Sequence, residues 1–307
     1  MKKAFSLIEV IFVLVILGIV ASISSQIIIQ VYESYILQNA LYRTTTKTEL
    51  VANQIVNRLT YTIPGTTIAK EPNKIYTPSS MGTNWIMLED IDASLHQNLI
   101  ALEWIGYDND SFSAGATPYW SGVANYETAT SNSFITPASQ LSEVNKTISN
   151  LSNKKINLDI SSNNPAVLFM NSDNYDVQCM GLINKNDTSC IFPIAKTLGT
   201  EDNLTFTGDH PTIVTERYKL AWSAYALVPI DEAPIGDGLY NLYLYYNYQP
   251  WNHETYKNNG TKKLLLTNIS VFKFTENGGV IQLKLCATEN IGADYNISSC
   301  KEKAIIK

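Results

Sequence analysis

One carboxylate, that of Glu9, stands immediately before a long uncharged stretch of the chain. No residue in the segment 10–32 carries a charge. A carboxylate at the edge of an apolar helix costs on the order of 2 to 3 kcal/mol when it is pulled toward the bilayer centre, and such residues usually have a partner. An ordinary membrane anchor needs no acidic residue here. The sequence therefore predicts that another group compensates the charge of Glu9.

Arrangements of residues for catalysis are poor elsewhere. The three histidines are His96, His210 and His253, and no second histidine follows His253-Glu254 at the spacing of a zinc-protease helix. Ser113-Ala114-Gly115 lacks the glycine that precedes a nucleophilic serine on a strand-to-helix turn. No glycine-rich phosphate loop is present. We therefore predict no catalytic residue, no cofactor and no enzymatic activity.

The segment 108–111 (Asp-Asn-Asp-Ser) offers oxygen ligands that could suit calcium. It lacks the glycine and the distal glutamate of a calcium-binding loop. A solvated turn is the favoured interpretation, and we predict no metal site.

The uncharged stretch is long enough to cross a membrane. At ~1.5 Å per helical residue it extends roughly 34 Å, compared with about 30 Å for a bilayer core. Lys2 and Lys3 precede it, which predicts a cytoplasmic N-terminus and export of the remainder. Two alternatives are an uncleaved anchor and secretory cleavage near Ser22-Ile23-Ser24. Glu9 argues against both.

Four cysteines follow the membrane segment: Cys179, Cys190, Cys286 and Cys300. In an oxidising compartment an even number of cysteines indicates disulfides, and three connectivities exist. We favour pairing the first with the second and the third with the fourth. Each pair would close a loop of about 15 residues or fewer and stabilise the protein by roughly 3 kcal/mol. The alternative of a metal site lacks short C-x-x-C spacing and nearby histidines.

Residues 2–10 (Lys-Lys-Ala-Phe-Ser-Leu-Ile-Glu-Val) resemble the class III leader of type IV prepilins and type II secretion pseudopilins. The resemblance implies that a prepilin peptidase cuts between Ala4 and Phe5 and methylates the new amine of Phe5. It also implies that Glu9 pairs with the N-terminal amine of a neighbouring subunit in a fibre. Ala4 stands where glycine is usual in this family.

The helix is expected to continue well beyond the membrane. No proline occurs between Phe5 and Ile63, so one helix of roughly 85 Å is predicted at ~1.5 Å per residue. Its second half is amphipathic. We expect the apolar stripe to pack on a sheet while polar side chains take the other faces. The residues of that stripe are Leu41, Thr48, Ala52, Ile55 and Leu59.

Short strands dominate the rest of the chain. Pro64-Gly65 is expected to end the helix, and Thr136-Pro137 to open a second helix with Leu141, Val144, Ile148 and Leu151 on one face. Glu276-Asn277-Gly278-Gly279 predicts a hairpin. The strand candidates are 166–170, 191–195, 219–228, 239–248, 264–274 and 280–286.

The strand candidate 239–248 is rich in tyrosine. Simple alternation places Tyr240, Leu242, Leu244, Tyr246 and Tyr248 on one face. Such a cluster could be a binding platform, but aromatic residues are favoured in sheets for their packing. A half-buried strand is the favoured interpretation.

These elements predict an α+β fold that is pilin-like, with a long N-terminal helix packed on a mainly antiparallel sheet. The helix comprises a membrane-spanning half and an amphipathic half. The expected organisation is a leader at 1–4, a transmembrane and assembly half at 5–32, an amphipathic half at 33–63, and an exported globular head at 64–307.

The charge of the chain does not favour nucleic acid as a partner. The formal net charge is −6, and removing the two lysines of the leader gives −6 − 2 = −8. Phosphate backbones bind proteins through clustered basic side chains. We predict no nucleic-acid binding.

Three asparagines lie in an acidic-x-Asn-x-Ser/Thr pattern: Asn145, Asn203 and Asn296. The acidic residue two places earlier resembles the requirement of bacterial oligosaccharyl transferases. They are candidate N-glycosylation sites, and chance is the alternative in so asparagine-rich a chain.

Size and strand order across the last third resemble the larger minor subunits of this superfamily, the PilW-class minor pilins and the J class of minor pseudopilins. The resemblance implies a structural minor subunit that primes the tip of a type IV pilus or type II secretion pseudopilus. Its partners would be the prepilin peptidase and other pilins or pseudopilins. It would sit in the bacterial inner membrane as a single-pass protein with its head in the periplasm, before joining the fibre. The alternative is an exported adhesin or enzyme that keeps an uncleaved N-terminal anchor.

Overall fold

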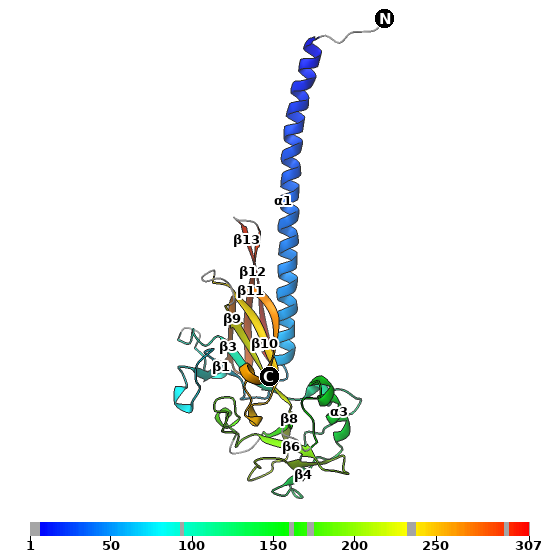
Figure 1. Ribbon diagram of the computed structural model, residues 1–307, viewed down its shortest axis with the longest axis vertical. Helices are drawn as coiled ribbons and strands as arrows, with labels where there is room; N and C mark the ends of the chain where they lie inside the picture. Colours follow the sequence, from blue (N-terminus) through cyan, green and yellow to red (C-terminus); the bar gives the residue numbers. More distant parts are fainter. Residues whose placement is uncertain are drawn as a thin grey trace.

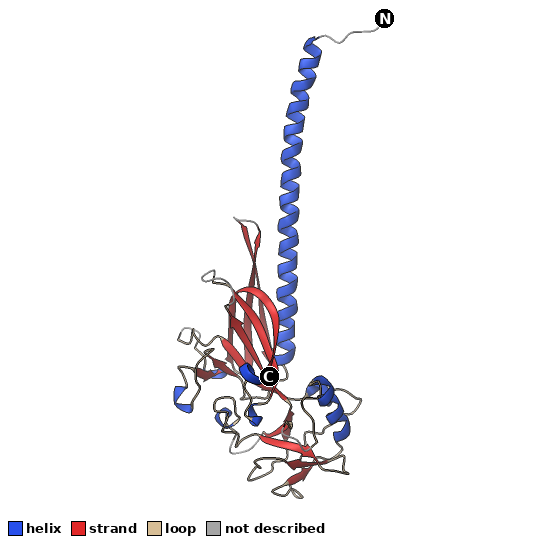
Figure 2. Cartoon of the chain, in the orientation of Figure 1, coloured by secondary structure: helices blue, strands red, loops and turns tan. Residues whose placement is uncertain are grey.

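A computed structural model describes residues 7–92, 95–159, 163–170, 175–231, 238–291 and 295–306 of the chain. Its longest element is helix α1 (Leu7–Leu59), which runs from the N-terminal end of the molecule to a β-rich head (Figure 1). The head consists mainly of antiparallel strands, with short helices between them (Figure 2). This is the α+β, pilin-like layout expected from the sequence.

Helix α1 ends at Leu59, earlier than the expected Ile63. The backbone N–H of Ile63 donates to the carbonyl of Ile105 at 2.9 Å, and the N–H of Tyr107 donates to the carbonyl of Tyr61 at 2.9 Å. Backbone groups in this segment therefore bond to a neighbouring part of the sheet. These bonds replace the i to i−4 bonds that would continue the helix.

The buried stripe of α1 begins one residue earlier than expected. Leu41 was predicted to face the sheet, yet it is 48% exposed, whereas Ala40 and Thr44 are buried. The sheet meets this part of the helix on the side of Thr44, whose hydroxyl donates to Glu289 Oε2 at 2.7 Å, and not on the side of Leu41. The buried residues of α1 are Ala40, Thr44, Thr48, Val51, Ala52, Ile55 and Leu59.

Among the described residues, the main sheet has eight strands, and every neighbouring pair is antiparallel. Helix α1 packs against the strands at one side of this sheet (Figure 1). In their order across the sheet the strands are β13 (Tyr295–Ile306), β12 (Val280–Ile291), β11 (Thr261–Asn277), β10 (Tyr240–Tyr248), β9 (Ser223–Ile230), β3 (Ala101–Gly106), β1 (Ile68–Lys70) and β2 (Trp85–Met87).

A large segment is inserted between two neighbouring strands of the main sheet. Gly106, the last residue of β3, pairs with Ser223, the first residue of β9. The chain between them, residues 107–222, leaves the sheet and returns to the same place. We call this segment the insertion. It lies beyond the C-terminal end of α1, at the pole of the molecule opposite the N-terminus (Figure 1).

The insertion contains a second sheet and the expected second helix. Helix α3 (Leu141–Leu151) buries Leu141, Val144 and Ile148, as predicted, but Leu151 is 48% exposed at the end of the helix. Helix α2 (Asn109–Phe112) is a single turn. Across the described part of this sheet the strands are β4 (Ser133–Ile135), β7 (Asn203–Phe206), β6 (Phe192–Lys196), β5 (Ala166–Phe169) and β8 (Tyr218–Ala221).

Short helical turns punctuate the loops of the head. Helix α4 follows β10 and comes shortly before β11. The bounds of these elements are η1 (Pro78–Ser80), η2 (Leu88–Asp90), η3 (Val177–Cys179), η4 (Pro250–Asn252) and α4 (Tyr256–Asn259).

The strand expected at 219–228 is two strands in two different sheets. β8 ends at Ala221 and pairs with β5 in the insertion, whereas β9 starts at Ser223 and pairs with β3 and β10 in the main sheet. Trp222 is the residue between them and is buried. Both strands are largely buried, so residues 218–230 form one nearly continuous hydrophobic run. Such a run has no alternation that changes at Trp222, and the sequence pattern therefore could not reveal the change of sheet.

The tyrosine-rich strand does not place all its predicted residues on one face. Asn247 has a positive φ of 65°, and the pairing of β10 with β9 is irregular between Tyr245 and Tyr248. An irregularity of this kind inverts the alternation of side chains beyond it. Leu242 and Leu244 consequently face α1, while Tyr248 joins Tyr245 on the opposite face.

Three clusters of buried side chains, counted over the described residues, hold the head together. The helix core lies between α1 and the main sheet and includes Ile55 and Leu283. The shared core lies on the other face of the main sheet and joins strand residues such as Tyr248 to insertion residues such as Met180. The insertion core is built around aromatic residues such as Phe134. The insertion is therefore continuous with the main sheet through buried apolar contacts.

Candidate membrane and assembly segment

The first half of α1 stands free of the head. All residues from Leu7 to Tyr35 are exposed, and burial begins near Ala40 (Figure 1). Among the described residues, α1 is the one helix long and apolar enough to cross a membrane. Leaving an apolar helix of this length in water is unfavourable, because removing each CH₂ group from water lowers the free energy by about 0.8 kcal/mol. The segment therefore requires a lipid or protein environment.

Glu9 lies in the first described turn of α1, and its side chain is exposed. A carboxylate near a helix N-terminus is stabilised by the unpaired backbone N–H groups there. Glu33 is the next charged residue and closes the uncharged stretch at its other end. The two carboxylates thus bracket the apolar part of the helix.

Ala4 and Phe5, the predicted cleavage residues, lie outside the described residues. The predictions of cleavage before Phe5 and of its methylation therefore rest on the sequence.

Comparison with known proteins bears on this same segment. Residues 1–25 match the model of the prokaryotic N-terminal methylation motif. The match supports a type IV prepilin-like protein. For such a chain the motif implies processing by a prepilin peptidase and assembly with other pilins, and it suggests a structural role. Together with the long apolar helix it fits membrane anchoring followed by pilus assembly. No curated protein and no solved structure matches the prepilin-like chain.

Both favoured disulfides are present in the head. Cys179 and Cys190 are joined within the insertion. Cys286 and Cys300 are paired residues of neighbouring strands β12 and β13, and a disulfide joins them across the ladder. Residues from Tyr295 onward, including Cys300, form β13. This long strand completes the sheet beside α1.

The three candidate glycosylation sites differ in accessibility. Asn145 lies within α3, and its Oδ1 accepts a hydrogen bond from the N–H of Leu158 at 2.7 Å. Asn203 begins β7, and its Oδ1 is buried. Asn296 lies near the start of β13 and is exposed. Asn296 is thus the most exposed of the three.

Asp108 is not part of a solvated turn. It is completely buried and caps α2, where its Oδ1 accepts from the N–H of Ser111 at 3.1 Å. Burial raises the pKa of Asp108 to about 7. No group of three or more histidine, cysteine, aspartate or glutamate residues that could hold a metal ion occurs in the described part of the chain.

Sequence reasoning missed a buried ion pair. Lys70 Nζ lies 2.5 Å from Glu103 Oε2, and both side chains are almost inaccessible to water. Tyr248 donates to Glu103 Oε1 at 2.8 Å, and Lys70 also donates to the carbonyl of Leu182 in the insertion. A charged residue inside a hydrophobic strand, Lys70 in β1 and Glu103 in β3, is a sign of a buried ion pair. Only the fold shows that these two residues meet.

Proposed function

We propose that the chain is a minor subunit of a type IV pilus or of a type II secretion pseudopilus. A prepilin peptidase cuts between Ala4 and Phe5 and methylates Phe5. Glu9 then pairs with the N-terminal amine of a neighbouring subunit while the exposed half of α1 enters the fibre. The single observation that carries this proposal is the methylation motif at residues 1–25, which overlaps the first part of an exposed apolar helix.

The charge of Glu9 supports its assembly role. Removing the leader would create a positive amine at Phe5, and this amine and the Glu9 carboxylate have opposite charges. In an environment of low dielectric constant, opposite charges attract strongly, which offsets the cost of removing each from water. Pairing between subunits would thus stabilise the register of neighbouring helices.

The insertion supports a place at the tip of the fibre. It extends beyond the C-terminal end of α1, at the end of the molecule opposite the exposed half of that helix (Figure 1). In a fibre of parallel helices this pole faces the subunits assembled earlier. A bulky extension is accommodated most easily where no earlier subunit lies above it. We therefore propose that the subunit primes the tip, with its head in the periplasm before assembly, as in the PilW-class minor pilins or the J class of minor pseudopilins.

A structural subunit needs no active site. We propose that the protein is not an enzyme, in keeping with its methylation motif.

The N-terminal residue of the protein isolated from its native membranes tests the proposal. Peptide mass spectrometry should find N-methylated Phe5. Intact Met1, or a start near Ser25, would refute processing as a prepilin.

A pair of matched variants tests the role of Glu9. Glu9→Ala should leave the protein in the membrane but strongly reduce its recovery in sheared fibres. Glu33→Ala removes the carboxylate at the other end of the uncharged stretch and should leave incorporation near the wild-type level. Equal incorporation of both variants would contradict pairing through Glu9.

A further inference from the structure

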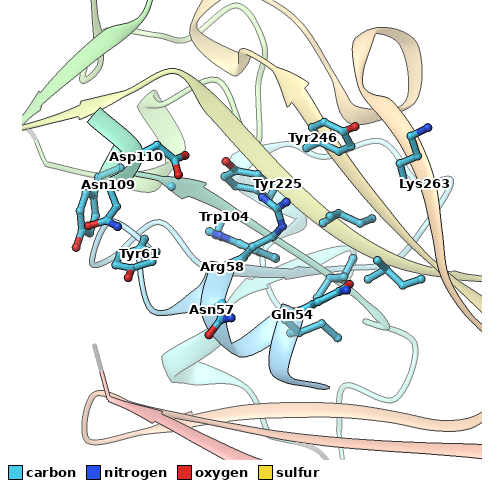
Figure 3. Close-up of a pocket in the computed structure, with 16 residues that line it drawn as sticks. Gln54, Asn57, Arg58, Tyr61, Trp104, Asn109, Asp110, Tyr225, Tyr246 and Lys263 are labelled. Carbon is cyan, nitrogen blue, oxygen red and sulfur yellow. The ribbon is translucent and has the colours of Figure 1, made fainter. Parts of the chain in front are cut away.

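A groove lies between the last turns of α1 and the part of the main sheet that the helix does not cover (Figure 3). Its volume is about 550 Å³, within the ≈ 300–1,000 Å³ of small-molecule sites. Its walls come from α1, β3, α2, β9, β10 and β11. The groove is separate from the membrane and assembly segment.

The floor of the groove is aromatic. The ring of Tyr225 stacks on Trp104 with centroids 5.7 Å apart, and the guanidinium of Arg58 lies 5.2 Å from the Tyr225 centroid. Gly106 makes room for this arrangement, because a Cβ there would lie 2.7 Å from a ring carbon of Tyr225. Tyr246 flanks the same arginine at 6.0 Å. Trp104 itself is fully buried, so the apolar surface that the floor presents comes from the partly exposed rings of Tyr225 and Tyr246, beside the positive charge of Arg58.

Several polar side chains at the rim of this floor have no hydrogen-bond partner within the described part of the chain. In the part of the chain that the structure describes, none of them forms a side-chain hydrogen bond or an ion pair, and all are exposed. Amide side chains both donate and accept, carboxylates accept, and guanidinium and ammonium groups donate. The rim therefore presents mixed donors and acceptors. Its members are Gln54, Asn57, Arg58, Asp110 and Lys263.

The strands under the groove argue against an extended peptide as its occupant. β9 is paired with β3 and β10, and β10 is paired with β9 and β11. No strand edge is open here for a peptide to add to the sheet. An amphipathic helix would place apolar side chains against a rim that carries charges and amides, which would leave those groups without partners.

A saccharide matches both the polar rim and the aromatic floor of the groove. Each sugar hydroxyl donates and accepts hydrogen bonds, as the rim requires, and the C–H face of a sugar ring is apolar, as the aromatic floor requires. We propose that this groove binds a saccharide of one or two rings, with Arg58 and Asp110 as the main hydrogen-bonding residues. The proposal goes beyond fibre assembly and does not depend on it.

Saturation-transfer NMR on the full chain tests this proposal. The probes are glucose, galactose, N-acetylglucosamine, maltose and lactose, each added to the protein in a zwitterionic detergent. Detergents with sugar head groups are avoided because they would compete for the groove. At least one probe should receive saturation at the C–H protons of a ring, and a titration then gives its Kd.

Two variants locate the binding. Arg58→Gln and Asp110→Asn should each raise the Kd about tenfold or more, because hydrogen bonds to charged groups are stronger than those between neutral groups. Arg43→Gln and Asp209→Asn make the same changes at exposed positions outside the groove and should leave the Kd unchanged. Near-ultraviolet circular dichroism checks that all four variants keep the native fold.

Three results would overturn the proposal. The first is no saturation transfer to any probe. The second is an equal Kd for the groove variants and the controls. The third is capture of a neighbouring subunit in fibres by a photoreactive group attached to the thiol of Asn57→Cys, which would make the groove a contact between subunits.

Discussion

Lys70 and Glu103 place two opposite charges where water hardly reaches them. Their Nζ and Oε2 atoms are 2.5 Å apart in the shared core, and Tyr248 and the carbonyl of Leu182 supply further hydrogen bonds. Burying charges costs several kcal/mol per ion, and attraction and hydrogen bonds offset this cost only while both partners are present. Loss of either partner leaves the other charge buried without compensation.

We expect Lys70→Met to lower the free energy of unfolding by about 3–5 kcal/mol. The double variant Lys70→Met/Glu103→Gln should be less destabilised than the sum of the two single variants, because the pair acts as a unit. Chemical unfolding followed by tryptophan fluorescence measures these values. The control is Lys284→Met in the exposed pair of Lys284 with Glu302, where about 0–1 kcal/mol is expected. A similar small loss for Lys70→Met would show that the pair contributes little.

Asp108 makes stability depend on pH. Its pKa rises from the ordinary value of 3.8 to about 7 in the folded protein, chiefly because burial disfavours the carboxylate. The folded state therefore holds this proton more tightly than the unfolded state. The resulting stabilisation is complete below pH 3.8 and is lost as the pH rises toward 7.

The variant Asp108→Asn should remove this part of the pH dependence. Asparagine caps helices about as well as aspartate, so α2 should persist. Unfolding at a series of pH values between 4 and 8 measures the effect, with Asp209→Asn as the exposed control. If Asp108→Asn and wild type lose stability in parallel over this range, Asp108 does not titrate there.

At the scale of elements, α1 meets the sheet through a narrow stripe. Ile55 is 2% exposed within this stripe, whereas Leu41 is 48% exposed although its spacing places it on the same face. Ile55→Ala should cost about 2–5 kcal/mol because it leaves a cavity in the helix core. Leu41→Ala should change the stability of the head by less than about 0.5 kcal/mol.

Thermal unfolding in detergent compares the stability lost in Ile55→Ala with that lost in Leu41→Ala. Equal losses would mean that the sheet, or another surface, covers Leu41 as well. The comparison thus tests where along α1 the packing against the head begins.

At the scale of the whole molecule, the insertion is not an independent module. Its residues Met180 and Leu182 lie in the same buried cluster as Tyr248 and Trp85 of the main sheet. Deleting 108–221 and closing the chain with an Asn-Gly turn would join neighbouring strands without strain on the pairing of Gly106 with Ser223. It would also expose one side of the shared core.

We expect the deleted chain to bind a hydrophobic dye and to be cut rapidly by proteases, because exposed apolar surface destabilises the remaining sheet. The control is a chain in which only the α2 segment is replaced by a flexible linker of the same length. A deleted chain as resistant to proteolysis as the full chain would show that the main sheet folds without the insertion.

Local sequence by itself determined the long helix, the strands β5, β6, β10, β11 and β12, the hairpin at Gly278-Gly279 and the resemblance of the N-terminus to a prepilin leader. These features depend on spacing along the chain, on the absence of proline and on the geometry of turns. The favoured cysteine pairs also followed from short loops along the chain, and the disulfides join them.

Tertiary structure alone decided the change of sheet at Trp222, the inverted face of Tyr248, the exposure of Leu41 and the meeting of Lys70 with Glu103. It also decided the groove, whose rim residues come from α1, α2 and β11. Each of these depends on contacts between residues far apart in sequence. Periodicity reports which side of an element is apolar, and the packing of other elements determines what covers that side.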